Sequence, residues 1–284
     1  MLKPAFLKDD AFLAEVRKGL AGNARRLWWL GQSGFLIIHG GRALLLDPYL
    51  SDSLTRKYEH TDKPHTRMTE CVIDPENLAA LGVIDLITSS HNHTDHFDPD
   101  TLKPLLSANR STRLVIPIAN REPANERLPG FSERFVEIDA GQSLTLNGIT
   151  ISALSSAHPT VERDSAGHCR FLGYVIEWDG VTFYHSGDTL WHEGLEPALG
   201  QFAIDIALLP INGDRPERRV AGNLDGPQAA RLAKSIEARL VIPCHFDLFE
   251  FNTASPEAFV LECKRIGQAF TVLRHGEGWD VSDQ

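Results

Sequence analysis

The sequence is poor in several features that would assign a protein to a particular compartment or redox class. It has only four cysteines, and Cys71, Cys169, Cys244 and Cys263 are too widely spaced to form a CxxC pair. This spacing indicates neither a cysteine zinc site nor a dithiol redox centre. Reduced thiols in a cytoplasmic protein explain these cysteines most simply.

Long apolar runs are missing as well. Residues 1–20 carry a charge every few positions, and no segment approaches 18 uninterrupted apolar residues. A secretory signal needs a continuous apolar region, and a membrane-spanning helix needs about 18 or more such residues. We therefore expect a cytoplasmic protein with no membrane partner.

Positive charge is scarce. Lysine and arginine total 28 against 38 aspartates and glutamates, which gives a net charge of −10. Such a balance opposes binding to nucleic acid or to an anionic membrane surface. The hydrophobic fraction of 42% is ordinary for a globular protein. We expect a small-molecule substrate and no nucleic-acid partner, and a homo-oligomer is compatible with the sequence.

One short segment is rich in metal-binding side chains. The run Ser-Ser-His-Asn-His-Thr-Asp-His, residues 89–96, follows a short apolar stretch that reads as a strand. On the turn after that strand, His91 and His93 would reach one metal while Asp95 and His96 would reach a neighbouring one. Imidazole and carboxylate suit zinc, manganese or iron. The alternative is a polar surface loop, but 12 histidines in 284 residues make this clustering hard to explain by chance.

Three more candidate ligands stand where predicted strands end. The strand ITISALSSA ends at His158, VTFYHS is followed by Gly187 and Asp188, and RLVIP is followed by Cys244 and His245. We interpret His158 as the third ligand of the first metal, His245 as completing the second, and Asp188 as bridging both. A single histidine after a strand more often caps or packs, but all three positions follow strands downstream of the cluster.

Predicted helices and strands alternate without a low-complexity linker. Helical spacing predicts helices at residues 6–20, 100–108, 226–236 and 256–268. Strands are predicted at residues 26–30, 34–38, 42–47, 85–90, 113–117, 134–139, 143–147, 149–156, 171–178, 181–186, 205–210, 239–243 and 270–273. Asn147-Gly148 and Asp179-Gly180 predict hairpin turns. Two strand-rich halves, each followed by helices, predict an α/β fold of two packed sheets in a single domain, residues 1–284.

The complete pattern resembles the five-motif signature of the metallo-β-lactamase superfamily. Its members here, in chain order, are Asp47, His91, His93, Asp95, His96, His158, Asp188 and His245. The resemblance spans almost the whole chain. It implies a four-layer αββα sandwich with the site at the open edge of the two sheets. It also implies that Asp47 orients the ligand loop rather than binding metal, although a strand-end cap would equally explain this residue.

Flanking segments narrow the resemblance. They look like the L-ascorbate-6-phosphate lactonase group, which includes manganese-dependent lactonases and has a distant phospholipase D branch. The segments are WLGQSGFLI at 29–37, LLLDPYLSDS at 44–53, HSGDT at 185–189, LLPINGD at 208–214 and IPCHFDLF at 242–249. The lactonase's substrate is not carried over with the fold. We expect residues 53–75 to form the substrate-facing wall.

Charge predicts the chemistry. Two divalent ions supply four positive charges, and Asp95 with Asp188 returns two negative ones. A bridging water in that field ionises near neutral pH, and the hydroxide attacks a carbonyl or phosphoryl centre. Asp95 can also carry the proton. We predict a metal-dependent hydrolase that holds two Zn²⁺ or Mn²⁺ ions, with Fe²⁺ as an alternative. Its expected substrate is a small polar ester or lactone that can carry a phosphate.

Other functions stay open. A phosphodiesterase or phospholipase D-like hydrolase is the main alternative. Diiron oxidoreductases of the superfamily typically have glutamate in place of His93 and a flavin domain for which this chain has no room. RNA-processing nucleases carry extra domains and basic surfaces that the sequence does not show. A non-catalytic metal-binding module is disfavoured, because such ionisable clusters usually serve chemistry.

Substrate contacts are predicted from polar and charged residues that flank the motifs. Basic residues after DPYLSDS and LLPINGD would hold a phosphate or carboxylate, and the alternative is a solvated charged loop. The predicted contacts are Arg56, Lys57, His168, His192, Asn212 and Arg215.

Overall fold

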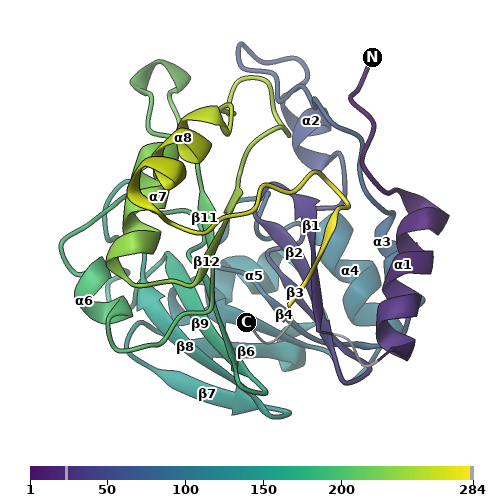
Figure 1. Ribbon diagram of the computed structural model, residues 1–284. Helices are drawn as coiled ribbons and strands as arrows, with labels where there is room; N and C mark the ends of the chain where they lie inside the picture. The colour runs from purple at the N-terminus through teal and green to yellow at the C-terminus, as the bar shows by residue number, and fades with distance from the viewer. Residues whose placement is uncertain (23–24, 282–284) are drawn as a thin grey trace.

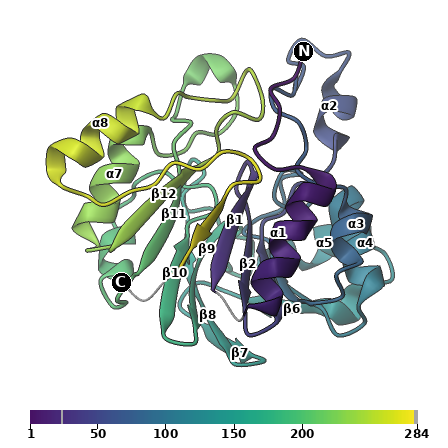
Figure 2. The ribbon, with the colours of Figure 1, turned by 45° about the vertical axis from the view of Figure 1, so that its right-hand side comes forward.

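Two β-sheets pack face to face in this protein and helices cover both outer faces, as Figures 1 and 2 show. The structure is a computed structural model that describes residues 1–22 and 25–281. The four layers form the αββα sandwich that the sequence predicts.

The first sheet has the strand order β13-β1-β2-β3-β4-β5-β6, and the second has the order β12-β11-β10-β9-β8-β7. The strands of the first sheet are β1 (Arg26–Gly31), β2 (Gly34–His39), β3 (Arg42–Leu46), β4 (Ile84–Thr88), β5 (Arg113–Pro117), β6 (Phe135–Ile138) and β13 (Gly278–Asp280). Those of the second are β7 (Ser143–Leu146), β8 (Ile149–Ser155), β9 (Leu172–Trp178), β10 (Val181–His185), β11 (Ile206–Pro210) and β12 (Leu240–Cys244).

The helices divide between the two outer faces. Those over the first sheet are α1 (Asp9–Ala21), α3 (Pro75–Ala79), α4 (Pro99–Ala108) and α5 (Arg121–Arg127). Those over the second are α6 (Leu195–Leu199), α7 (Gly226–Ser235) and α8 (Glu257–Ile266). Helix α2 (Ser53–Tyr58) lies apart from both layers, at the end of the molecule where Figure 1 places it above the sheets. Three short 3₁₀ turns complete the set, at Ile118–Asn120, Ser132–Arg134 and Pro216–Arg218.

The central strands are buried on both faces, so neighbouring side chains serve two different cores. Trp28 and Leu36 point towards the helices over the first sheet, whereas Trp29 and Phe35 point towards the second sheet. Strands covered on both sides read as continuous apolar runs, because neither face meets water. This explains why RLWWL and GFLII show no polar alternation.

The sequence located the predicted helices and most strands within a few residues. Both hairpin predictions hold: Asn147 and Asp179 have φ of 51°, and each is followed by a left-handed glycine, as a tight hairpin turn requires. The strand predicted at residues 270–273 is wrong, because only Phe270 forms an isolated bridge, to Val241. Beyond it the chain crosses to the first sheet and pairs there as β13.

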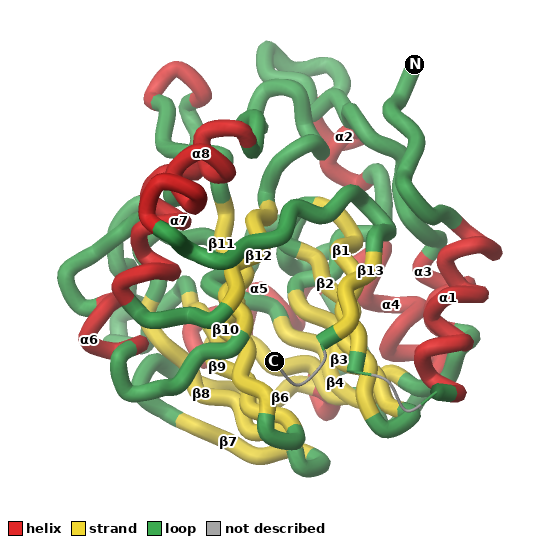
Figure 3. Tube along the Cα trace, in the orientation of Figure 1, coloured by secondary structure: helices red, strands yellow, loops and turns green. Residues whose placement is uncertain are grey.

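Chain direction brings the functional segments to one edge. Strands β3 and β4 are parallel, as are β10, β11 and β12, and parallel strands end at the same edge of their sheet. The loops beyond these ends gather at the upper edge in Figure 3. Within the described part of the chain, none of the helices has the length and apolar character needed to cross a membrane.

Candidate metal centre

The loop after β4, residues 89–96, carries four of the candidate ligands and is held from behind; we call it the ligand loop. Asp47 follows β3 with φ of 39° and is fully buried. Its carboxylate accepts a bond of 2.9 Å from the backbone N–H of Ser90 and another from the Ser90 hydroxyl. On the other side, the guanidinium of Arg127 donates to the carbonyls of Asn92 and Phe97. These bonds fix the loop without using any ligand atom.

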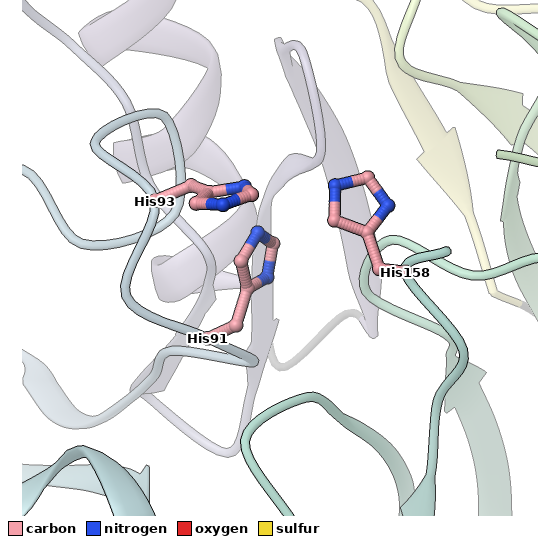
Figure 4. A group of neighbouring side chains, drawn as sticks. All are labelled: His91, His93 and His158. Carbon is pink, nitrogen blue, oxygen red and sulfur yellow. The ribbon is translucent and has the colours of Figure 1, made fainter. Parts of the chain in front are cut away.

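Three histidines converge in the first group. Ligand nitrogens of His91, His93 and His158 all lie within 4.8 Å of one another. Figure 4 shows His91 and His93 coming from the ligand loop and His158 from the opposite side, after β8. The Nδ1–H of His158 donates to the Gly222 carbonyl at 2.9 Å, which leaves Nε2 as the lone-pair atom. The Nε2 of His91 is buried and has no hydrogen-bond partner among the described residues.

The second group contains a carboxylate and two histidines. Ligand atoms of Asp95, His96 and His245 also lie within 4.8 Å of one another. The Nδ1–H of His96 donates to Asp47 at 2.7 Å, and its Nε2 faces the group, buried and with no hydrogen-bond partner in the described part of the chain. His245 has φ of 59°, and its backbone N–H donates to the Gln32 carbonyl at 2.8 Å.

Asp188 lies between the two groups. Its carboxylate oxygens are 3.3 Å from Nε2 of His96, 3.3 Å from Nε2 of His245 and 3.7 Å from Nε2 of His158. Gly187 precedes it with φ of 57°, and a Cβ there would lie 2.6 Å from the Ser90 Cβ. Only glycine therefore lets this turn pack against the ligand loop.

The electrostatics of the two groups fit divalent cations. Although burial opposes ionisation, His245 and His96 hold the pKa of Asp188 well below its ordinary value. Burial also opposes the charged form of His96, but the carboxylates of Asp188 and Asp95 raise the pKa of this histidine well above its ordinary value. Desolvation instead lowers the pKa values of His91 and His158. The carboxylates of Asp188, which is buried, and Asp95, which is 16% exposed, stand among five imidazole rings and form a donor set for cations.

A third set of close ligand atoms, from Asp47, His91 and His96, is less suited to a metal. Both Asp47 oxygens already accept hydrogen bonds from Ser90 and His96. The hydrogen bonds of Asp47 therefore position Ser90 and His96.

Gln32 is a contributor that the sequence reasoning did not identify. Its side-chain Nε2 donates to Asp95 Oδ2 at 2.7 Å and lies 3.0 Å from Nε2 of His245. Its Oε1 is buried and accepts no hydrogen bond from residues 1–22 or 25–281. The only signal was its position in the turn Gly31–Gly34 between two strands, which does not reveal the contact across the site.

A cavity of about 620 Å³ opens onto five of the seven candidate ligands, His93, Asp95, His158, Asp188 and His245. Small-molecule sites commonly fall between about 300 and 1,000 Å³. Leu54, Lys57, Tyr58 and His65 form part of the lining, so the predicted substrate-facing segment, residues 53–75, does reach this cavity.

Of the six predicted substrate contacts, Lys57 lines this cavity. Arg56 pairs with Asp100 and faces a different hollow. Arg215 and Asn212 line another hollow, and Asn212 donates to Asn252, which does reach the cavity. His168 lies against Asp164, and His192 bonds the Ser155 carbonyl. Both histidines stand outside the cavity lining.

Comparisons with known proteins agree with this geometry. A model of the β-lactamase superfamily domain matches residues 26–245. A UPF0173 metal-dependent hydrolase from Rubrobacter xylanophilus is 27% identical over 270 residues, covering 92% of this chain and 98% of the relative.

Two solved structures share the fold. A metallo hydrolase from Ignicoccus hospitalis has a TM-score of 0.66 at 22% identity, covering 92% of this chain and 100% of its own. An isothiocyanate hydrolase from Delia radicum gut bacteria has a TM-score of 0.69 at 17% identity, covering 91% of this chain and 100% of its own. The family match covers most of the chain and includes the ligand positions from His91 to His245. The chain therefore belongs to the metallo-β-lactamase superfamily and is one of its metal-dependent hydrolases.

Proposed function

We propose that this protein hydrolyses a small ester or lactone with two divalent ions, Zn²⁺ or Mn²⁺, held by the seven side chains of the candidate centre. The observation that carries the proposal is the position of Asp188 between two groups of ligand atoms at the base of one cavity. When bound, such ions supply Lewis acidity that brings the pKa of water towards about 7 and polarises the substrate oxygen.

The protein's own residues prepare the site for this reaction. Hydrogen bonds from Nδ1 direct Nε2 of His158 and His96 into the two groups. Asp95 is 16% exposed at its side chain and lines the cavity, so it can exchange a proton with a bound substrate. The Gln32 amide holds its Oδ2.

Few cationic side chains are available to bind a phosphate group on the substrate. Lys57 and Arg127 line the cavity among the described residues, and Arg127 already donates to Thr94 and to backbone carbonyls. Lys57 is therefore the proposed contact for an anionic substituent.

An activity screen of zinc-loaded and manganese-loaded protein tests the proposal. The panel contains γ-butyrolactones, carboxylic esters, bis-p-nitrophenyl phosphate and a β-lactam, with His93→Ala as the control variant. We expect turnover of lactones or esters that is lost in His93→Ala and after chelation. Turnover of the phosphodiester alone would favour the phosphodiesterase or phospholipase D-like alternative. Full activity of His93→Ala would refute the two-metal mechanism.

A further inference from the structure

One side of the cavity is built from aromatic side chains that belong to neither main core. Tyr58, His65, Phe249 and Phe251 form this surface, which we call the aromatic wall. The His65 ring stacks on Tyr58 at 4.1 Å between centroids with 21° between the planes, and lies 4.4 Å from Phe251 and 5.5 Å from Phe249. Phe249 and Leu54 anchor the wall in a small separate cluster.

Backbone pairing fixes the wall although its parts are far apart in sequence. The segment around Arg67 forms an antiparallel bridge with Phe249, and flanking bonds run from Met68 N–H to the Leu248 carbonyl at 2.7 Å and from Glu250 N–H to the Thr66 carbonyl at 3.0 Å. This pairing lies at the end of the molecule where Figure 1 places α2. The rings are therefore held in place before a substrate binds.

His65 serves the wall as a neutral ring. Desolvation is the main cause that lowers its pKa, and its Nδ1–H donates to the Lys63 carbonyl at 3.1 Å. A neutral imidazole adds a flat surface and leaves Nε2 as a hydrogen-bond acceptor. Tyr58, His65 and Phe251 are each only partly buried and all three line the cavity. The ammonium groups of Lys57 and Lys63 lie over the rings of Tyr58 and Phe251, at 5.1 and 5.9 Å from the centroids.

Two further apolar residues line the cavity. Val220, which is 37% exposed, and Ala221 line the same cavity. The loop that carries them is tied to the loop below the wall by an ion pair of 2.7 Å between Arg219 and Asp62. The cavity therefore offers small apolar side chains in addition to the aromatic rings.

We propose that the aromatic wall binds a planar aromatic group on the part of the substrate that does not react. The preferred substrates are then esters or lactones that carry an aryl substituent rather than unsubstituted ones. The substrate preference rests on the proposed function, because it assumes ester or lactone hydrolysis. The binding of an aromatic group to the wall does not depend on that reaction. Ring stacking and burial of a phenyl group give an expected gain in affinity of about tenfold.

Calorimetry with zinc-loaded protein tests the binding without turnover. Phenylacetate, cyclohexylacetate and acetate share one carboxylate and differ in the group offered to the wall. We expect phenylacetate to bind about tenfold more tightly than acetate and more tightly than cyclohexylacetate. Phe251→Ala should remove most of that preference, Phe251→Tyr should retain it, and Leu261→Ala, at an exposed position on α8, should leave it unchanged. Equal affinities for the three acids, or an unaltered preference in Phe251→Ala, would overturn the proposal.

A kinetic comparison separates this inference from the proposed function. γ-Phenyl-γ-butyrolactone and γ-butyrolactone share the ring that opens and an alkoxide leaving group. A higher kcat/KM for the phenyl compound, reduced in Phe251→Ala, supports both proposals. If neither lactone is hydrolysed while the preference for phenylacetate persists, the proposed lactone hydrolysis is wrong and the proposed role of the aromatic wall is supported. If both lactones have the same kcat/KM and the three acids bind with the same affinity, the proposed role of the aromatic wall is wrong and the proposed hydrolysis is supported.

Discussion

Asp47→Asn should weaken metal binding although Asp47 touches no metal. The carboxylate accepts from Ser90 and from the Nδ1–H of His96 at 2.7 Å, and this bond leaves Nε2 of His96 free to bind a metal. An amide in its place presents an N–H to one of these donors. His96 then accepts at Nδ1 and carries its proton on Nε2, where the metal should bind.

Loss of such a partner typically lowers metal affinity about 10- to 100-fold, which is about 1.4–2.7 kcal/mol. Zinc affinity is measured by competition with a chromophoric chelator, and the free energy of unfolding by denaturant titration of the metal-free protein. We expect one of the two ions to bind more weakly and unfolding to cost about 1–3 kcal/mol less, because a buried donor loses its acceptor.

Asp98→Asn is the matched control. Asp98 is also fully buried and accepts bonds from Ser51 and Thr101 at the start of α4, but it contacts no candidate ligand. It should lose stability while binding zinc normally. If Asp47→Asn retained wild-type affinity for both ions, the reasoning about the His96 tautomer would be wrong.

Three other variants or conditions probe the same contacts. Gln32→Ala removes the amide that positions Asp95, so metal binding at the group of Asp95, His96 and His245 should weaken. Gln32→Glu should weaken metal binding less, because it offers the metal a carboxylate oxygen. Metal titration by calorimetry checks both variants. Because Asp188 and Asp95 raise the pKa of His96 despite its burial, metal must displace a proton from it. Apparent affinity should therefore rise with pH and level off above that raised pKa, and calorimetry in buffers of different ionisation enthalpy should detect proton release; pH-independent binding would contradict this. Arg127→Met should speed amide exchange in the ligand loop and lower stability by about 1.5–3 kcal/mol. Arg121 lies on the same helix as Arg127, and Arg121→Met removes its ion pair with Glu137 on β6 and its contact with the Phe135 ring. This variant should cost about 1 kcal/mol.

Local patterns predicted the fold, and they predicted that the candidate metal ligands lie close together. Apolar runs bounded by glycine turns define strands, and strand ends are where parallel chains bring side chains together. His91, His93 and His158 could therefore be grouped from the sequence alone. The same reasoning missed β13, whose three residues pair with β1 at an edge and carry no pattern of their own.

Contacts between distant loops were not predictable in this way. Gln32 and Asp95 are 63 positions apart in the sequence and form a hydrogen bond. His65 contacts Phe251 because Arg67 and Phe249 form a β-bridge, and no local sequence pattern predicts that bridge. Charge alone drew attention to Arg56 and Arg215, but each side chain faces another hollow. Side-chain direction in a loop depends on tertiary packing, so substrate contacts are harder to predict than ligands fixed at strand ends.

Metal content at saturation tests the central claim most directly. Protein dialysed against zinc and then freed of excess metal should contain two ions per chain by mass spectrometry, and Asp188→Ala, which removes the carboxylate between the two groups, should retain fewer. A single ion per chain at saturation, or two tightly bound ions in Asp188→Ala, would contradict the dinuclear site.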